Sequence, residues 1–170
     1  MNGKAKALAR SSMAAAAGVT MLYLGSVLPS ARISILCIAA LGVAFVTVSC
    51  SSGWAMCCFV VTGALSLLLL PEKTLAFLYV LLPGYYPVIK IRTERFGSVW
   101  VRWGIKLIVF HVSFAASMLL SRLFAPLAEL ISGISFWFLW LGALAVFLLY
   151  DYVLGLLILY YLRSISGRIK

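Results

Sequence analysis

Six long apolar runs, separated by short polar breaks, constrain this chain more than any other feature. A membrane-spanning helix needs about 20 mostly apolar residues, and these runs are close to that length. The chain is 65% hydrophobic and only 11% charged, whereas about a quarter of the residues of a soluble domain are charged. A chain of 170 residues could not bury this much apolar surface in a core of its own. The sequence therefore predicts an integral membrane protein.

The apolar runs also predict the fold class. The expected spans cover residues 11–28, 33–48, 54–70, 74–89, 101–120 and 134–162. They lack the alternation of polar and apolar residues that membrane barrels show, so helices are the expected spanning elements. Few residues remain for loops. We therefore expect an all-α polytopic membrane protein in which residues 1–170 form a single domain of six transmembrane helices.

The basic residues predict the orientation in the membrane, because cytoplasmic loops carry an excess of Lys and Arg. If the N-terminus is cytoplasmic, eleven of the fourteen basic residues lie inside, and only Arg32, Lys73 and Arg122 lie outside. The inside residues are Lys4, Lys6, Arg10, Lys90, Arg92, Arg95, Arg102, Lys106, Arg163, Arg168 and Lys170. Both termini are therefore expected in the cytoplasm. The basic residues from Lys90 to Lys106 are expected on the cytoplasmic side, in and beside the main cytoplasmic loop, which joins the fourth and fifth spans.

The net charge of +10 is explained by this asymmetry and by contact with anionic lipid headgroups. Binding to nucleic acid is not expected, because no polar surface combines basic and aromatic residues. Membrane lipids are the expected partners of these charges.

Small residues recur four apart in the first span, at Ser12 and Ala16 and in neighbouring pairs. This spacing lets another helix approach closely in a membrane. Two interpretations remain open at this point. The face either docks another membrane protein or packs within the same bundle.

Two ionisable residues, His111 and Asp151, lie well inside the predicted spans. Such residues are costly in lipid and therefore suggest a function. Their depths are similar, about 13 Å from Arg102 and about 18 Å from Arg163 at the helical rise. They are expected to form an intramembrane polar pair if their spans are neighbours. The alternatives are an Asp bonded to a nearby Tyr or Ser, a proton relay, or a substrate ligand.

The fourth span is interrupted near its inner end by Pro83, Gly84 and Pro87. Proline removes a backbone donor and kinks a helix, and glycine permits unusual backbone geometry. The segment is interpreted either as an interfacial helix end or as a hinge that couples the span to the basic segment after it.

Catalytic signatures are absent from the sequence. The chain has one His and four acidic residues, and it lacks a metalloprotease motif, a nucleophile elbow and a P-loop. The cysteines do not have the spacing of a metal or redox site. No catalytic residue, metal or cofactor is expected, and any ATP hydrolysis would need separate chains.

The order of these features resembles the substrate-binding S components of energy-coupling factor transporters. Those proteins have six spans, cytoplasmic termini and a first helix in which basic residues precede an A-x-x-x-A pattern. The stretch KALARSSMAAAAGVTMLYLGSVLP has this style, with Ser12 in place of the first alanine and Ala16 as the second. The six-span spacing covers the whole chain, and the motif covers the first span.

The resemblance implies a membrane subunit that captures a small, vitamin-like organic substrate in the bacterial cytoplasmic (inner) membrane. It implies docking to a transmembrane coupling subunit that works with two ATPase subunits. A metal substrate is not expected, because the nickel and cobalt members carry a histidine near the N-terminus.

The sites that this hypothesis assigns follow from the predicted topology. Docking is assigned to Ser12, Ala16, Arg92 and Arg95. Candidate substrate contacts on the outer side are Tyr23, Arg32, Tyr79 and Glu129.

Two other functions remain open. A non-transporting scaffold of the bacterial wall-synthesis or rod-shape type has a similar length and span number, and it predicts a tightly packed interior. A small membrane enzyme that uses His111 and Asp151 predicts that these two side chains meet beside a cavity.

Overall fold

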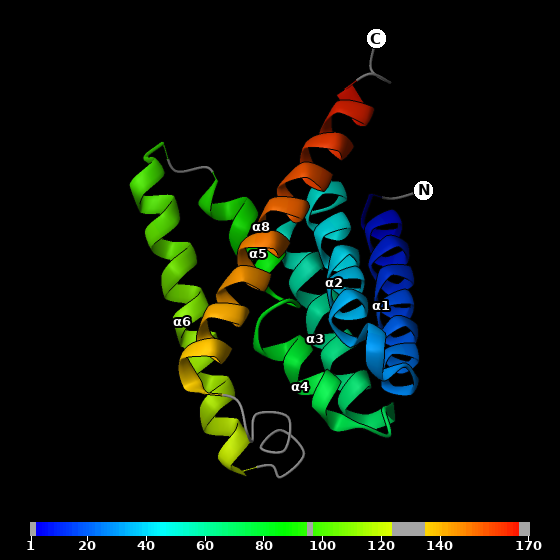
Figure 1. Cartoon of the computed structure of the whole chain (residues 1–170). Coiled ribbons are helices and arrows are strands. Elements are labelled where there is room, and N and C mark those ends of the chain that lie inside the picture. The colour runs from blue at the N-terminus through cyan, green and yellow to red at the C-terminus, as the bar shows by residue number, and fades with distance from the viewer. Residues whose placement is uncertain (1–2, 95–96, 124–134, 167–170) are drawn as a thin grey trace.

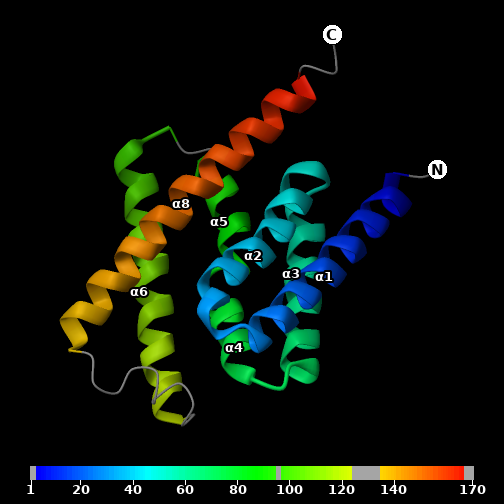
Figure 2. The same ribbon diagram turned by 45° about the vertical axis from the view of Figure 1, so that its right-hand side comes forward.

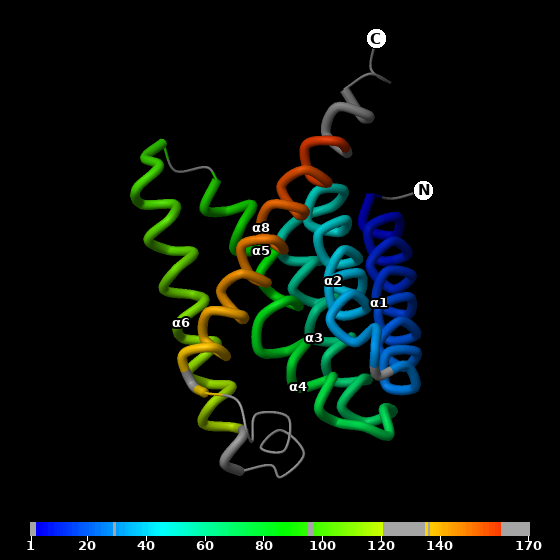
Figure 3. The backbone as a smooth tube through the Cα atoms, in the orientation of Figure 1, coloured from blue at the N-terminus to red at the C-terminus, as the bar shows by residue number. Residues whose placement is uncertain are grey.

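The computed structural model describes residues 3–94, 97–123 and 135–166 (Figure 1), and Figure 3 traces the path of its backbone. Its helices are α1 (Gly3–Val27), α2 (Arg32–Ser49), α3 (Ser52–Leu69), α4 (Lys73–Leu81), α5 (Tyr86–Thr93), α6 (Val99–Leu123) and α8 (Phe136–Ser166), with a 3-10 turn at Pro29–Ala31. Within the described residues, six segments are long and apolar enough to cross a membrane, and α4 and α5 together form the fourth. The predicted all-α, six-span fold is confirmed.

Prolines mark two of the connections between spans. Pro29 begins the short turn between α1 and α2, and Pro71 follows the end of α3. Proline cannot donate the backbone hydrogen bond that would continue a helix, and it disfavours helical geometry in the residue before it. An ion pair joins these two connections, because Arg32 Nη2 lies 2.6 Å from Glu72 Oε2.

The bundle has two distinguishable ends (Figures 1 and 2). Helix α1 begins and α8 ends at the same end, which we call the termini end. The turns at residues 28–31 and 70–72 lie at the opposite end, which we call the loop end. Helices α1 to α4 pack side by side, whereas α6 stands beside them and α8 runs obliquely across the bundle. The cytoplasmic location of the termini end remains a prediction.

The buried stripe of α1 consists mainly of small residues: Ser11, Ala15, Gly18, Leu22 and Gly25. These residues let α1 approach α2 and α3 closely. The neighbouring pair Ser12 and Ala16 is exposed on the outer surface of the bundle. Packing within the bundle therefore accounts for the Ser11–Ala15 stripe and leaves the Ser12–Ala16 face uncovered.

The fourth span is broken between α4 and α5, as its sequence predicts. The backbone N–H of Gly84 donates to the Tyr79 carbonyl over 2.9 Å, which closes a wide turn. A Cβ atom at Gly84 would lie 2.7 Å from the Phe59 ring, so the close approach requires glycine. Pro87 lies in the first turn of α5, where its missing N–H removes no helical hydrogen bond.

The predicted loop between the fourth and fifth spans is shorter than expected. Helix α5 continues to Thr93, and α6 already begins at Val99. Lys90 is only 2% exposed, and Lys106 points to the same buried carboxylate, that of Asp151. These two lysines belong to the spans because they have a counter-ion there, which the count of basic residues could not detect.

A first prediction concerns the close packing of α1. The Cβ of a residue at position 18 would lie 3.1 Å from Thr62 Cγ2. We therefore expect Gly18→Val to lower the free energy of unfolding by about 1–3 kcal/mol, because overpacking forces helices apart. The matched variant Ala17→Val, at an exposed position of the same helix, should change it little. Unfolding of the purified protein in detergent measures the difference, and equal stability of the two variants would contradict this packing.

Candidate functional site

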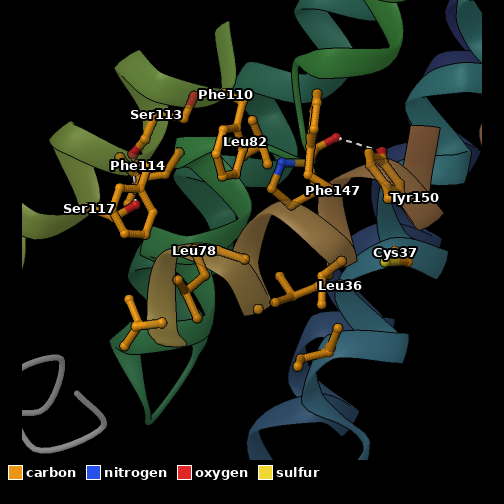
Figure 4. Close-up of a pocket in the computed structure, with 17 residues that line it drawn as sticks. Leu36, Cys37, Leu78, Leu82, Phe110, Ser113, Phe114, Ser117, Phe147 and Tyr150 are labelled. Carbon is orange, nitrogen blue, oxygen red and sulfur yellow. Dashed lines mark hydrogen bonds between the residues drawn. The ribbon is translucent and has the colours of Figure 1, made fainter. Parts of the chain in front are cut away.

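A cavity of about 530 Å³ lies between α2, α4, α6 and α8 (Figure 4). Most of its lining side chains are aliphatic or aromatic. The polar exceptions are Cys37, Ser113, Ser117 and Tyr150. Its volume falls within the roughly 300–1,000 Å³ that is usual for small-molecule pockets.

The cavity occupies the loop-end half of the bundle. Its α2 residues, from Ile33 to Cys37, lie just after the turn at the loop end, and its α8 residues come from the first half of that helix. The α6 residues, from Phe110 to Ser117, lie in the half of α6 that approaches the same end.

The hydroxyl groups of the cavity wall have partners within the protein. The hydroxyls of Ser113 and Tyr85 share a hydrogen bond of 2.5 Å, and Ser117 Oγ donates to the Ser113 carbonyl over 2.8 Å. The Tyr150 hydroxyl donates to the Pro83 carbonyl over 3.0 Å. This last bond satisfies a carbonyl at the break between α4 and α5, which matters because lipid supplies no donor.

Aromatic rings form the floor of the cavity toward the termini end. The ring of Phe147 lies 5.1 Å from that of Phe110 and 5.0 Å from that of Tyr86, between ring centroids. Tyr150 packs against Tyr86 at 5.8 Å. Tyr86 and Phe147 are almost fully buried, so this layer separates the cavity from the charged groups behind it.

The Asp151 carboxylate is the centre of the charged groups beyond the floor. Oδ1 accepts from the Tyr86 hydroxyl over 2.6 Å and from Lys90 Nζ over 2.5 Å. Oδ2 accepts from Lys106 Nζ over 2.7 Å. We call these four residues the Asp151 cluster. Lys90 also donates to the Asp151 carbonyl, and Glu94 lies 3.7 Å from Lys90 Nζ.

The Asp151 cluster joins three helices. Lys90 belongs to α5, Lys106 to α6 and Asp151 to α8. Moving a charge out of water costs several kcal/mol even after relaxation. Here both carboxylate oxygens accept hydrogen bonds from charged donors, which are stronger than neutral ones. The cluster therefore holds the three helices together while satisfying the charges that burial would otherwise leave unpaired.

The predicted pair of His111 and Asp151 is replaced by other contacts. His111 is exposed, its Nδ1 lies 2.8 Å from the Leu107 carbonyl, and its ring lies 6.0 Å from that of Trp140. Asp151 bonds to a tyrosine, which was one of the alternatives, and to two lysines that sequence reasoning missed. The sequence does contain a signal for part of the cluster, because Tyr86 and Lys90 are one helical turn apart and can therefore face the same partner.

The three predicted substrate residues that the structure describes do not line the cavity. Arg32 is bound to Glu72 at the loop end. Tyr79 is fully buried and packs against Phe59, with 6.0 Å between ring centroids. Tyr23 is 49% exposed on α1. Glu129 lies outside the described residues.

The predicted docking residues are divided between the surface and the part that is not described. Ser12 and Ala16 are exposed on α1. Arg92 is exposed at the termini end, where its Nη2 donates to Ser52 Oγ over 2.9 Å. Arg95 lies outside the described residues.

The predicted hinge residues Pro83, Gly84 and Pro87 lie at the break between α4 and α5. Their motion remains a prediction.

Among the described residues, no three His, Cys, Asp or Glu side chains form a group that would hold a metal ion. No protein-family model, curated protein or solved structure matches this chain. The fold alone therefore defines the class of protein, a multi-pass membrane protein with six candidate spans.

A second prediction concerns the Asp151 cluster. We expect Asp151→Asn to lower the free energy of unfolding by about 3–5 kcal/mol, because two buried lysines lose their counter-ion. The control Glu72→Gln, which breaks a more exposed pair, should cost about 0–1 kcal/mol. Thermal unfolding in detergent compares the variants.

A triple variant separates charge from packing. Asp151→Leu combined with Lys90→Met and Lys106→Met removes all three charges, and apolar replacement of a buried ion group is often neutral or stabilising. The triple variant should therefore be more stable than Asp151→Asn. If Asp151→Asn were no less stable than Glu72→Gln, the cluster would not hold the helices together.

Proposed function

We propose that this chain is the substrate-binding subunit of an energy-coupling factor type importer in a bacterial cytoplasmic membrane. In this proposal it captures a small, vitamin-like organic molecule and docks a separate coupling subunit. The observation that carries the proposal is the cavity of about 530 Å³ in the loop-end half of a six-span bundle.

The position of the cavity supports uptake from outside. The excess of basic residues favours a cytoplasmic termini end. With that orientation, the loop end faces outward and the cavity lies in the outer half of the membrane. A substrate would enter there, and the aromatic floor and the Asp151 cluster would separate it from the cytoplasm.

The exposed face at Ser12 and Ala16 supports docking. Small side chains on the surface of a transmembrane helix let a partner helix approach until the backbones nearly touch. This face is left free by the packing of α1 against α2 and α3. Arg92 lies exposed at the termini end, where a partner on the cytoplasmic side would reach it.

Transport in this proposal is a rigid-body tilt of the bundle that carries the cavity toward the cytoplasm, a form of alternating access. ATP hydrolysis by two partner subunits would drive the tilt, since the chain has no P-loop.

The two other functions receive less support from the geometry. A scaffold has no need of a cavity, and its predicted interior is tightly packed. An enzyme built on His111 and Asp151 needs the two side chains together, whereas both Asp151 oxygens accept from Tyr86, Lys90 and Lys106.

A third prediction tests the assignment to an importer. The tagged chain, gently extracted from its native membrane, should copurify with one polytopic coupling subunit and two ATPases that carry P-loops, identified by mass spectrometry. Ala16→Trp should reduce their recovery by about tenfold or more, because a large side chain prevents the close approach of helices.

The control for this prediction is Ala64→Trp, at an exposed alanine on α3, which should retain both partners. Recovery of wall-synthesis proteins without ATPases would overturn the proposal in favour of a scaffold.

A further inference from the structure

We infer that the cavity binds a neutral, largely apolar molecule whose hydroxyl or carbonyl groups lie along one edge, and that it rejects charged molecules of the same size. This inference rests on the proposed function for the identification of the cavity as the substrate site. It adds the chemical class of the substrate.

The part of the cavity lining that the structure describes carries no fixed charge. Among the described lining residues there is no Asp, Glu, Lys, Arg or His. A carboxylate or ammonium group that entered would lose its hydration without gaining a counter-ion, at a cost of several kcal/mol. A neutral ligand loses little in the same place, because apolar contacts replace its contacts with water.

The charged groups behind the aromatic floor are already paired. Asp151, Lys90 and Lys106 bind one another with separations of 2.5 and 2.7 Å. The rings of Phe110, Phe147 and Tyr86 lie between these groups and the cavity. A charged substrate could recruit one of the lysines only by breaking the cluster that joins α5, α6 and α8.

The polar edge of the ligand is determined by α6. Ser113 and Ser117 are four residues apart and therefore share one face of the helix, and both line the cavity (Figure 4). A hydroxyl oxygen has two acceptor lone pairs in addition to its proton, so Ser117 can still accept after donating to the Ser113 carbonyl. Of the two hydroxyl protons on Tyr85 and Ser113, their shared bond uses one. The wall thus offers a neutral ligand an acceptor at Ser117 and, when Tyr85 donates in the shared bond, a donor at Ser113.

The wall opposite these serines is mostly apolar. Its apolar side chains are Leu36 on α2, Leu78 on α4, Leu82 just after α4, and Val146 and Phe147 on α8. Its polar groups are the Cys37 thiol, a weak donor, and the Tyr150 hydroxyl, whose proton is used by the Pro83 carbonyl. A ligand with polar groups on both edges would bury one set without partners, which costs about 1–3 kcal/mol for each group. The cavity therefore favours a ligand whose polar groups lie mainly along the α6 edge.

Cys37 provides a reporter for this selectivity, because its partly buried thiol lines the cavity. A variant in which Cys50, Cys57 and Cys58 are replaced by Ala leaves Cys37 as the only thiol. Methanethiosulfonate reagents convert a thiolate into a mixed disulfide and release methanesulfinate. The neutral benzyl reagent, the anionic sulfonatoethyl reagent and the cationic trimethylammonioethyl reagent are compared in the same detergent, and intact mass gives the rates.

Three further variants make the test specific. A variant that retains only Cys57, which is exposed, normalises each rate for intrinsic reactivity and for partitioning into the micelle. Ala143→Trp in the Cys37 variant fills the cavity, since Ala143 lines it. Ala145→Trp adds the same side chain at an exposed position of α8.

The normalised rate at Cys37 should be at least about tenfold higher for the neutral reagent than for either charged one. A tenfold difference in rate corresponds to a free-energy difference smaller than the several kcal/mol that burying a charge costs. Ala143→Trp should slow the neutral reagent by about tenfold or more, because a filled interior leaves no room for it. Ala145→Trp should leave the rate unchanged.

Equal normalised rates for all three reagents would overturn the inference, and so would an unchanged rate in Ala143→Trp. Neither result depends on recovery of the coupling subunit and ATPases. Failure of that recovery with selective labelling intact would reject the importer and keep the class of ligand. Recovery of the ATPases with unselective labelling would keep the importer and reject the inferred class of ligand.

Discussion

The Asp151 carboxylate is the interaction on which the arrangement of the second half of the molecule depends. It lies 2.5 Å from Lys90 Nζ and 2.7 Å from Lys106 Nζ, and it also accepts from Tyr86. Helices α1 to α4 pack side by side, but α6 stands beside that group and meets α8 through a few side chains. Apolar contact alone gives little preference for one position of α6, since lipid tails are equally apolar. The bonds between the Asp151 carboxylate and the two lysines fix the position of α6 relative to α5 and α8. The shape of the cavity depends on this position, because α6 and α8 form two of its walls.

The break in the fourth span and the Asp151 cluster depend on each other. Because the helix stops at Leu81 and restarts at Tyr86, α5 has a direction of its own, and Tyr86 and Lys90 both reach Asp151. The break also leaves backbone carbonyls without helical donors, and the Tyr150 hydroxyl satisfies that of Pro83. Residues 150 and 151 of α8 therefore stabilise the broken span through its backbone and through its side chains. Gly84 permits the break because a Cβ at that position would collide with Phe59.

The spans were predictable from the sequence, whereas the cluster and the cavity were not. The length of an apolar run determines whether it can cross a membrane, so the six spans and the break at Pro83–Gly84 follow from local sequence alone. The positive-inside rule predicts the cytoplasmic side for Lys90 and Lys106, but it counts charges and does not ask which of them has a counter-ion. Asp151 is 61 residues from Lys90 along the chain, and only the packing of α8 brings them together. The cavity is lined by Leu, Phe and Ala residues, which have the same sequence pattern whether they enclose a space or fill it.

The separation of neutral cavity and charged cluster also bears on how the proposed importer would move. A rocking motion that opened the cavity inward would have to part α5, α6 and α8 on the termini side, where the Asp151 cluster joins them. Parting them would leave charges unpaired inside the membrane, at a cost of several kcal/mol for each. A tilt of the whole bundle keeps every bond of the cluster and moves the cavity with its walls intact. The structure therefore favours the tilt, provided that a partner covers the polar ends of the bundle as they enter the lipid.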